Sequence, residues 1–185
     1  MLEAIQAFDW TVLHRLYETL SCGFLDFLMP KITALGNGGV IWIIAAAALI
    51  ISKKYRKYGI VMLIGLLAGL ITGNLCLKNL VARQRPCWVE NIPLLISNPT
   101  DYSFPSGHTL SSVIGAYVLA SANRKFGFAA IPLAVLIIFS RLYLYVHFPT
   151  DIIASVIIGI IIGFFSIFAL KSLKSQKRLR IYKRV

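Results

Sequence analysis

The hydrophobic residues of the chain gather in long apolar stretches that short polar segments separate. A helix needs about 20 apolar residues to cross the roughly 30 Å hydrocarbon core of a membrane. Apolar stretches of this kind are found at residues 39–52, 59–77, 108–122, 126–146 and 149–170. The first reaches that length only with the apolar residues that precede it. The pattern predicts an all-α fold, an integral membrane helical bundle.

The first 22 residues have an apolar spacing close to that of a helix, but they carry charges at Glu3, Asp9, Arg15 and Glu18. Charged side chains are costly inside hydrocarbon, so we expect an amphipathic helix that lies in the membrane interface. A sixth span at residues 12–35 is the alternative. The prediction is five to six transmembrane helices with an N-terminal interfacial helix, and a short membrane-dipping segment that ends in the glycine-rich run at 36–39.

Composition supports a membrane protein. Of the 185 residues 58% are hydrophobic, and the mean hydropathy is +0.77. A formal net charge of +12 would indicate a nucleic-acid partner in a soluble protein. Here the basic residues form short runs between apolar stretches, which is typical of membrane topology, so we expect no nucleic-acid partner. The three cysteines have no metal-ligand spacing.

The basic residues predict how the chain is oriented in the membrane. With five spans, the basic runs at residues 53–58 and 123–126 and in the C-terminal tail fall on one side. Loops rich in lysine and arginine stay in the cytoplasm, so this side should be cytoplasmic. We expect the loop at residues 83–106 and the chemically interesting residues to lie on the outer side.

Residues 140–151 place an arginine, a histidine and an aspartate within apolar sequence. Ionisable groups in such surroundings are usually functional. Asp151 follows His147 by four residues, and Pro149 suits the first turn of a helix, so the carboxylate can reach back to the imidazole. Arg141 lies about 9 Å before His147 along a helix, where its guanidinium can hold an anion that the imidazole attacks.

Two cations follow the second apolar stretch. Lys78 and Arg85 have no acidic partner within their segment, and Pro86 is expected to end any helix there. We expect an anionic ligand to supply the missing negative charge.

The segment FPSGHT, residues 104–109, predicts the start of a helix. Ser106 is placed to cap a helix that begins near His108, and backbone N–H groups at such a start bind phosphate oxygens. Gly107 allows close approach of the backbone to a ligand. His108 is placed to give a proton to a departing oxygen.

These three segments resemble the motifs of the type 2 phosphatidic acid phosphatases, membrane lipid phosphatases related to vanadium haloperoxidases and glucose-6-phosphatase. The family pattern has a lysine, six residues and Arg-Pro; then Pro-Ser-Gly-His; then Ser-Arg, five residues, a histidine, three residues and an aspartate. The chain keeps every spacing, at Lys78, Arg85 and Pro86; at Pro105, Ser106, Gly107 and His108; and at Ser140, Arg141, His147 and Asp151.

The resemblance implies a role for each matched residue. His147 would attack phosphorus and form a phosphohistidine, Asp151 would orient it, and His108 would protonate the leaving oxygen. The substrate phosphate would be bound by Lys78, Arg85, Ser106, Gly107 and Arg141. The resemblance also implies no cofactor and no metal, and a site with one carboxylate leaves little to hold Mg²⁺.

The resemblance further implies a single transmembrane lipid phosphatase domain, at residues 1–170. The basic residues that follow predict a cytoplasmic tail at 171–185. The expected substrate is a phospholipid or polyprenyl diphosphate at the outer face, with undecaprenyl diphosphate hydrolysed to undecaprenyl phosphate as the first choice. Phosphatidylglycerophosphate or phosphatidate phosphatase is the nearest alternative. Vanadate-dependent oxidation and a non-catalytic lipid-binding or transport protein are more distant ones. The motifs do not determine the lipid or the oligomeric state.

Overall fold

The computed structural model of the chain describes residues 2–90 and 92–182, without the side chains of residue 2 and residues 173–182. All regular secondary structure within these ranges is helical, which confirms the predicted all-α fold. The elements are α1 (Leu2–Leu20), α2 (Gly23–Leu35), the 3₁₀-helix η1 (Asn37–Gly39), α3 (Val40–Ile51), α4 (Arg56–Gly69), the π-helix η2 (Leu70–Leu77), α5 (Lys78–Val81), α6 (Pro86–Val89), α7 (Gly107–Ala122), α8 (Arg124–Tyr143) and α9 (Pro149–Tyr182).

Three stretches of the described chain are long and apolar enough to cross a membrane, namely Arg56–Val89, Arg124–Tyr143 and Pro149–Ser172. A fourth candidate is the pair formed by Gly23–Leu35 and Asn37–Ile51, which is bent by 43°. Helix α7 has 16 residues, fewer than a full crossing takes. The structure therefore supports three to four spans, and the count of five to six stays a prediction, as does the interfacial N-terminal helix.

The bend between α2 and α3 has a local cause in the glycine-rich run. Gly38 has a φ of 57° and Gly39 a φ of 70°, in the left-handed region that other residues rarely adopt. The predicted membrane-dipping segment and the first predicted stretch thus form one broken unit. The apolar stretch at residues 39–52 is too short to cross a membrane on its own because it is only the second half of this broken unit.

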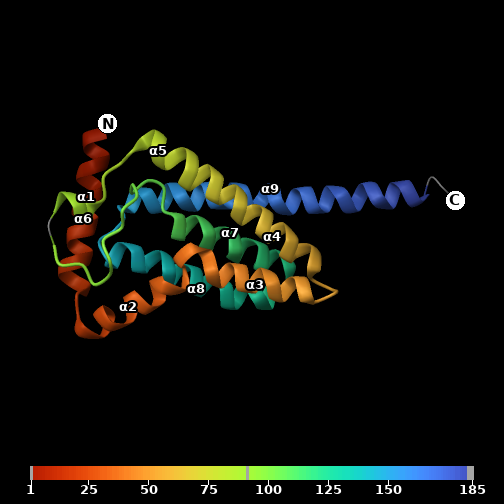
Figure 1. Cartoon of the computed structure of the whole chain (residues 1–185), viewed down its shortest axis with the longest axis horizontal. Coiled ribbons are helices and arrows are strands. Elements are labelled where there is room, and N and C mark those ends of the chain that lie inside the picture. Colours follow the sequence, from red (N-terminus) through yellow and green to blue (C-terminus); the bar gives the residue numbers. More distant parts are fainter. Residues whose placement is uncertain (1, 91, 183–185) are drawn as a thin grey trace.

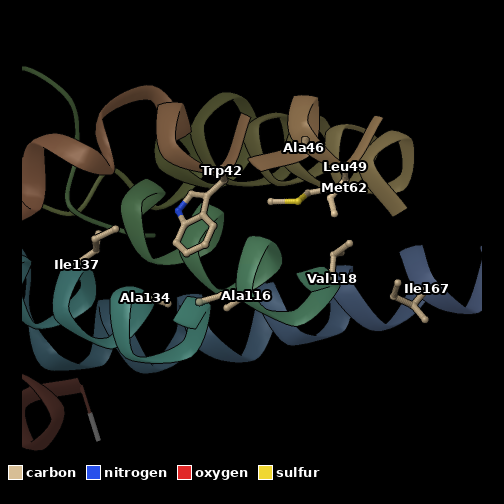
Figure 2. Close-up of a cluster of buried hydrophobic side chains, with 10 residues drawn as sticks. Trp42, Ala46, Leu49, Met62, Ala116, Val118, Ala134, Ile137 and Ile167 are labelled. Carbon is tan, nitrogen blue, oxygen red and sulfur yellow. The ribbon is translucent and has the colours of Figure 1, made fainter. Parts of the chain in front are cut away.

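Helix α7 lies at the centre of the bundle and packs against α4, α8 and α9. Trp42 of α3 is buried against Ala116 of α7 and Ala134 of α8, as Figure 2 shows. The indole N–H of Trp42 donates to Ser112 Oγ at 3.1 Å. A Cβ atom at Gly115 would lie 2.5 Å from the indole ring, so a glycine lets α3 and α7 approach closely.

The two ends of the bundle differ. Helix α1 lies across one end, next to the start of α9 and the long loop that follows α5 (Figure 1). The α3–α4 and α7–α8 connections lie at the opposite end (Figure 1). The three motif segments are therefore gathered at the α1 end, and the basic loops at the other.

One expectation from the sequence was wrong, and another concerns residues whose side chains the structure does not describe. Pro86 does not end a helix but begins one, because α6 starts at this residue, where its fixed φ suits the first turn. The segment at residues 83–106 therefore contains a short helix. The predicted basic tail at 171–185 falls largely outside the described side chains, and its role stays a prediction.

Candidate active site

His147 lies in the tight turn that joins α8 to α9, and only 1% of its surface is exposed. The turn needs Tyr145 in the left-handed region, with a φ of 59°. Such a conformation costs roughly 1–3 kcal/mol for a residue other than glycine. The Tyr145 hydroxyl donates to Glu90 Oε2 at 2.5 Å, and its ring packs against Tyr17 of α1. These contacts hold the turn that carries the imidazole.

The two ring nitrogens of His147 face different surroundings. Nε2 accepts a hydrogen bond from Arg85 Nη1 at 3.1 Å, so the ring proton lies on Nδ1. Nδ1 faces Ser103 Oγ at 3.5 Å and Asp151 Oδ2 at 3.7 Å. Burial, with the positive charges of Arg85 and Arg141 nearby, lowers the pKa of His147 well below its ordinary value. A neutral ring keeps a lone pair on Nε2.

The carboxylate of Asp151 is fully buried in the first turn of α9. Its Oδ2 accepts from Ser103 Oγ at 2.5 Å and from the backbone N–H of Phe148 at 2.9 Å. Its Oδ1 accepts from Arg83 Nη1 at 2.6 Å. The 3.7 Å to His147 Nδ1 exceeds a hydrogen bond, so the carboxylate lies beside the neutral ring without bonding to it. Ser103 and Arg83 were not among the predicted site residues.

Lys78 and Arg85 share a carboxylate that the sequence analysis did not place in the site. Asp101, in the loop before α7, forms ion pairs with Lys78 and with Arg85, the latter at 2.7 Å. Partial burial alone would raise the pKa of Asp101, but the hydrogen bond and charge of Lys78, with help from Arg85, lower it to about 2. The expectation of a single carboxylate was therefore wrong.

Arg85 is held on several sides and is 2% exposed. Besides the Asp101 carboxylate, it donates from Nε to the Asp101 carbonyl at 2.7 Å and from Nη1 to the Val146 carbonyl at 2.6 Å. The second carbonyl belongs to the residue just before His147. Arg85 thus joins the loop that carries Asp101 to the turn that carries His147.

Arg141, near the end of α8, is buried but incompletely bonded. Its Nη1 donates to Thr33 Oγ1 of α2 at 2.6 Å. Its Nε is the one buried side-chain polar atom without a hydrogen-bond partner among the described residues. An unpaired guanidinium nitrogen in a buried position is costly, and a bound anion would satisfy it.

Helix α7 begins at Gly107 with Ser106 as its cap, as the sequence predicted. Ser106 Oγ accepts from the Thr109 N–H at 3.4 Å, and the Ser106 N–H donates to Ser155 Oγ at 2.8 Å. Gly107 lines the cavity described below, whereas Ser106 is fully buried behind it. The start of the helix therefore lies at the cavity, and the free N–H groups of a helix start can bind an anion.

His108 lies on the cavity wall, against the bend between α2 and α3. Its Nε2 lies 3.0 Å from Asn37 Oδ1. A Cβ atom at Gly36 would be 2.7 Å from the imidazole, so the glycine makes room for the ring. Sequence reasoning treated this run only as a break in the helix. Its close approach to His108 could not be read from local spacing.

A cavity of about 890 Å³ joins these groups. Six of the eight predicted site residues line it, namely Lys78, Arg85, Gly107, His108, Arg141 and His147. Ser106 and Asp151 lie behind this wall. The cavity continues along apolar side chains of α3, α4 and the start of η2, namely Ile43, Leu63, Leu66, Leu67 and Leu70. It thus combines a strongly cationic end with a wall suited to a hydrocarbon chain.

The donor set of the cavity favours an anion over a cation. Three basic side chains surround His147, and Asp101 is already paired with two of them. Over the described part of the chain, no group of three histidine, cysteine, aspartate or glutamate residues could hold a metal ion. That the reaction needs no metal stays a prediction about activity.

Comparison with known proteins assigns the chain to a family. The sequence profile of the PAP2 superfamily matches residues 54–173. The chain belongs to the PAP2 superfamily. This assignment confirms the resemblance drawn from the three motifs. The matched region begins before α4 and takes in all eight predicted site residues, while α1, α2 and α3 precede it.

Relatives within this superfamily act on lipid phosphates. The chain is 39% identical over 129 residues to an undecaprenyl-diphosphatase of Sulfolobus acidocaldarius, over 69% of this chain and 62% of that relative. It is 31% identical over 140 residues to the undecaprenyl-diphosphatase BcrC of Bacillus subtilis, over 76% of this chain and 72% of the relative. The chain thus matches less than two thirds of the first relative's length.

The fold is also shared with a solved structure. The PAP2 type phosphatidylglycerolphosphate phosphatase of Bacillus subtilis superposes with a TM-score of 0.75, over 91% of this chain and 87% of that one, at 24% sequence identity. At this identity the likeness concerns the fold. With the apolar helices, it identifies the chain as a multi-pass membrane protein.

Proposed function

We propose that the chain is a membrane lipid phosphatase that works through a phosphohistidine at His147. One observation carries this proposal: Nε2 of His147 faces a cavity with three cations, while Nδ1 faces the buried carboxylate of Asp151. A neutral imidazole keeps a lone pair on Nε2, which accepts from Arg85 Nη1 in this structure and becomes available to phosphorus once Arg85 turns to the bound phosphate. Its N–H points to the group that can stabilise it when it becomes positively charged.

In the first step the phosphate group displaces Asp101 from Lys78 and Arg85. Arg141, with its unpaired Nε, and the N–H groups at the start of α7 bind the remaining phosphate oxygens. Nε2 of His147 then bonds to phosphorus as the bond to the leaving oxygen breaks. His108, which also lines the cavity, acts in its protonated form and gives a proton to that oxygen.

In the second step water attacks the phosphohistidine. His108, now without its proton, accepts a proton from the water, and the bond between phosphorus and Nε2 breaks. Inorganic phosphate leaves, and His147 returns to its neutral form. The side chains of Lys78, Arg85 and Arg141 stabilise the charge on the phosphate oxygens in both steps.

The proposed substrate is undecaprenyl diphosphate, converted to undecaprenyl phosphate. The names of two relatives support this choice. The cavity supports a lipid in general, because its apolar wall along α4 leads away from the cations. Phosphatidylglycerophosphate or phosphatidate is the second candidate, since the cations bind phosphate and make no distinction among lipids. Residues 1–170 would form the phosphatase domain.

We further propose that the site faces the outside of the cell and that the C-terminus lies in the cytoplasm. The basic connections lie at the end of the bundle opposite the site (Figure 1), and such loops remain in the cytoplasm. In this arrangement five helices span the membrane and α1 lies in the outer interface. The basic tail at 171–185 would lie against the inner membrane surface.

Phosphate release from the purified protein in detergent tests the function. The panel contains undecaprenyl diphosphate, phosphatidylglycerophosphate and phosphatidate, each with and without EDTA, and kcat/KM gives the preference. We expect release that survives EDTA, is inhibited by vanadate and is fastest for undecaprenyl diphosphate. Absence of release from all three lipids would contradict the proposed function, and loss in EDTA that Mg²⁺ restores would contradict the mechanism.

A further inference from the structure

A half-buried arginine between two buried carboxylates connects helix α1 to the candidate nucleophile. Asp9 of α1 is fully buried. Its carboxylate accepts from the N–H of Thr150 at 2.9 Å and from the Thr150 hydroxyl at 2.5 Å. It also accepts from Arg83 Nη2 at 2.6 Å. The mechanism above assigns no role to either Asp9 or Arg83.

The other arm of the same guanidinium reaches the site. Arg83 Nη1 donates to Asp151 Oδ1 at 2.6 Å and to the Thr150 hydroxyl at 2.9 Å. The guanidinium also lies 4.2 Å from the centre of the Phe148 ring, which suits a cation–π contact. Arg83 therefore joins two buried carboxylates, one on α1 and one on α9. Its contact with Asp151 fixes Oδ1 and leaves Oδ2 facing His147.

We propose that Arg83, held by Asp9 of α1, is a positioning residue for the His147–Asp151 pair. This inference rests on the proposed function, because it assigns Arg83 a part in phosphohistidine formation. A buried carboxylate that loses its cation is strongly disfavoured, so without Arg83 the Asp151 side chain would reorient towards another donor. Such a change would move the charge that stabilises the imidazole as its Nε2 bonds to phosphorus.

The hydrogen bonds from position 83 to both carboxylates require an arginine. Two carboxylates lie on different edges of one planar group, and the guanidinium donates to both at 2.6 Å. A lysine has one ammonium nitrogen and cannot reproduce this fork. Helix α1 supports the same turn through packing, because Leu13 and Trp10 pack with Tyr145 and Phe148 on either side of His147. The PAP2 match begins at residue 54, so this helix lies outside the matched region.

The test uses the full chain in detergent with Arg83→Gln, Arg83→Lys and Asp9→Asn. The control is Arg15→Gln, which removes an exposed arginine of α1. We expect Arg83→Gln to lower kcat and the rate of phosphoenzyme formation about 10- to 100-fold, the range for groups that orient a catalytic residue. KM and vanadate inhibition should change by less than about threefold, because the cations of the phosphate site stay in place. Arg83→Lys should recover part of the loss, Asp9→Asn should show a smaller loss, and Arg15→Gln should match wild type.

A double-mutant cycle separates positioning from simple support of the fold. In an Asp151→Asn background, Arg83→Gln should add little further loss, because Arg83 acts through Asp151. Additive losses, or a parallel fall in vanadate affinity and Tm, would overturn the inference. If Arg83→Gln does not fold, the same cycle is measured with Arg83→Lys and Asp9→Asn. Wild-type phosphate release is measured first: its absence contradicts the proposed function, whereas an active wild type with equally active Arg83 variants contradicts only this inference.

Discussion

The two histidines of the candidate site are held in very different ways. His147 is buried, and the groups around it come from the α8–α9 turn, the loop before α7 and, through Arg83, helix α1. His108 is half-buried on the cavity wall, and its side-chain partner is Asn37 in the glycine-rich bend. The proposed reaction would therefore use one histidine in a fixed setting and one beside a helix break.

The difference matches the work proposed for each residue. A nucleophile must return to the same geometry in both steps, and this favours a setting fixed by many contacts. A group that first gives and then accepts a proton must contact a lipid oxygen and later a water molecule. His108 lines the cavity and is only half-buried, so both can reach it. The comparison predicts that changes around His147 affect all substrates, and that changes around His108 depend on the leaving group.

The largest effect is expected for His147→Ala. Removal of the nucleophile should lower kcat by on the order of 10⁴-fold or more, equally for a lipid alcohol and for an aryl phosphate leaving group. Steady-state phosphate release on both substrates measures it. A loss that becomes small with aryl phosphate would mean that this residue does not attack phosphorus.

His108→Ala should cost about 10²- to 10⁴-fold with a simple lipid phosphate, the usual contribution of a positioned acid. The loss should shrink with diphosphate and shrink further with aryl phosphate, because better leaving groups need less protonation. The ratio of variant to wild-type kcat along this series gives the answer. A ratio that stays constant along the series would contradict the assignment of His108 as the acid.

Asn37→Ala tests whether the bend acts on His108. We expect a loss of about 3- to 10-fold with lipid phosphate, consistent with the loss of one hydrogen bond of about 1 kcal/mol. This loss should shrink along the same leaving-group series. The control is Asn79→Ala, since the amide of Asn79 in α5 donates to the Leu75 carbonyl of the adjoining η2 at 2.9 Å. Equal losses for both variants would contradict the proposal that Asn37 in the bend acts on His108.

The smallest effect is expected for Asp101→Asn. This change weakens the ion pairs that Lys78 and Arg85 must release before they bind the substrate phosphate. The variant should lower KM by about two- to fivefold, since an amide leaves Lys78 and Arg85 more available to the substrate. The pKa of Asp101 is lowered to about 2, so the carboxylate is ionised throughout the neutral pH range. The ratio of the two KM values should therefore be constant between about pH 5 and pH 9. A higher KM in the variant would show that Asp101 instead helps to hold the cations for the substrate.

Local pattern was enough to predict most of the helices. The predicted starts of α7 and α9 lie within one residue of the observed ones. The reason is that Ser106 caps the first helix and Pro149 suits the first turn of the second. The number of spans was not predictable in the same way. Helix α7 is short, and two glycines in left-handed conformation divide one apolar unit into α2 and α3. Hydropathy records how apolar a stretch is and not where the backbone bends.

The site was predictable only where a motif fixes the spacing. Lys78, Arg85, His108 and His147 lie around one cavity, and the predicted membrane topology together with the family motifs led to that expectation. The supporting residues were missed because their partners are far away in sequence. Arg83 and Asp9, for example, are separated by 74 positions. No local rule indicates which of several loop acids reaches a given arginine, so Asp9 was interpreted only as an obstacle to membrane crossing.

Rapid-quench trapping of the phosphoenzyme tests the division of labour between the two histidines most directly. Wild type, His147→Ala and His108→Ala are mixed with a radiolabelled diphosphate substrate, quenched within one turnover and assayed for acid-labile, base-stable label on the protein. The account predicts label on wild type and on His108→Ala, and none on His147→Ala. Label that accumulates on His147→Ala but not on His108→Ala would contradict it, because the nucleophile would then be His108.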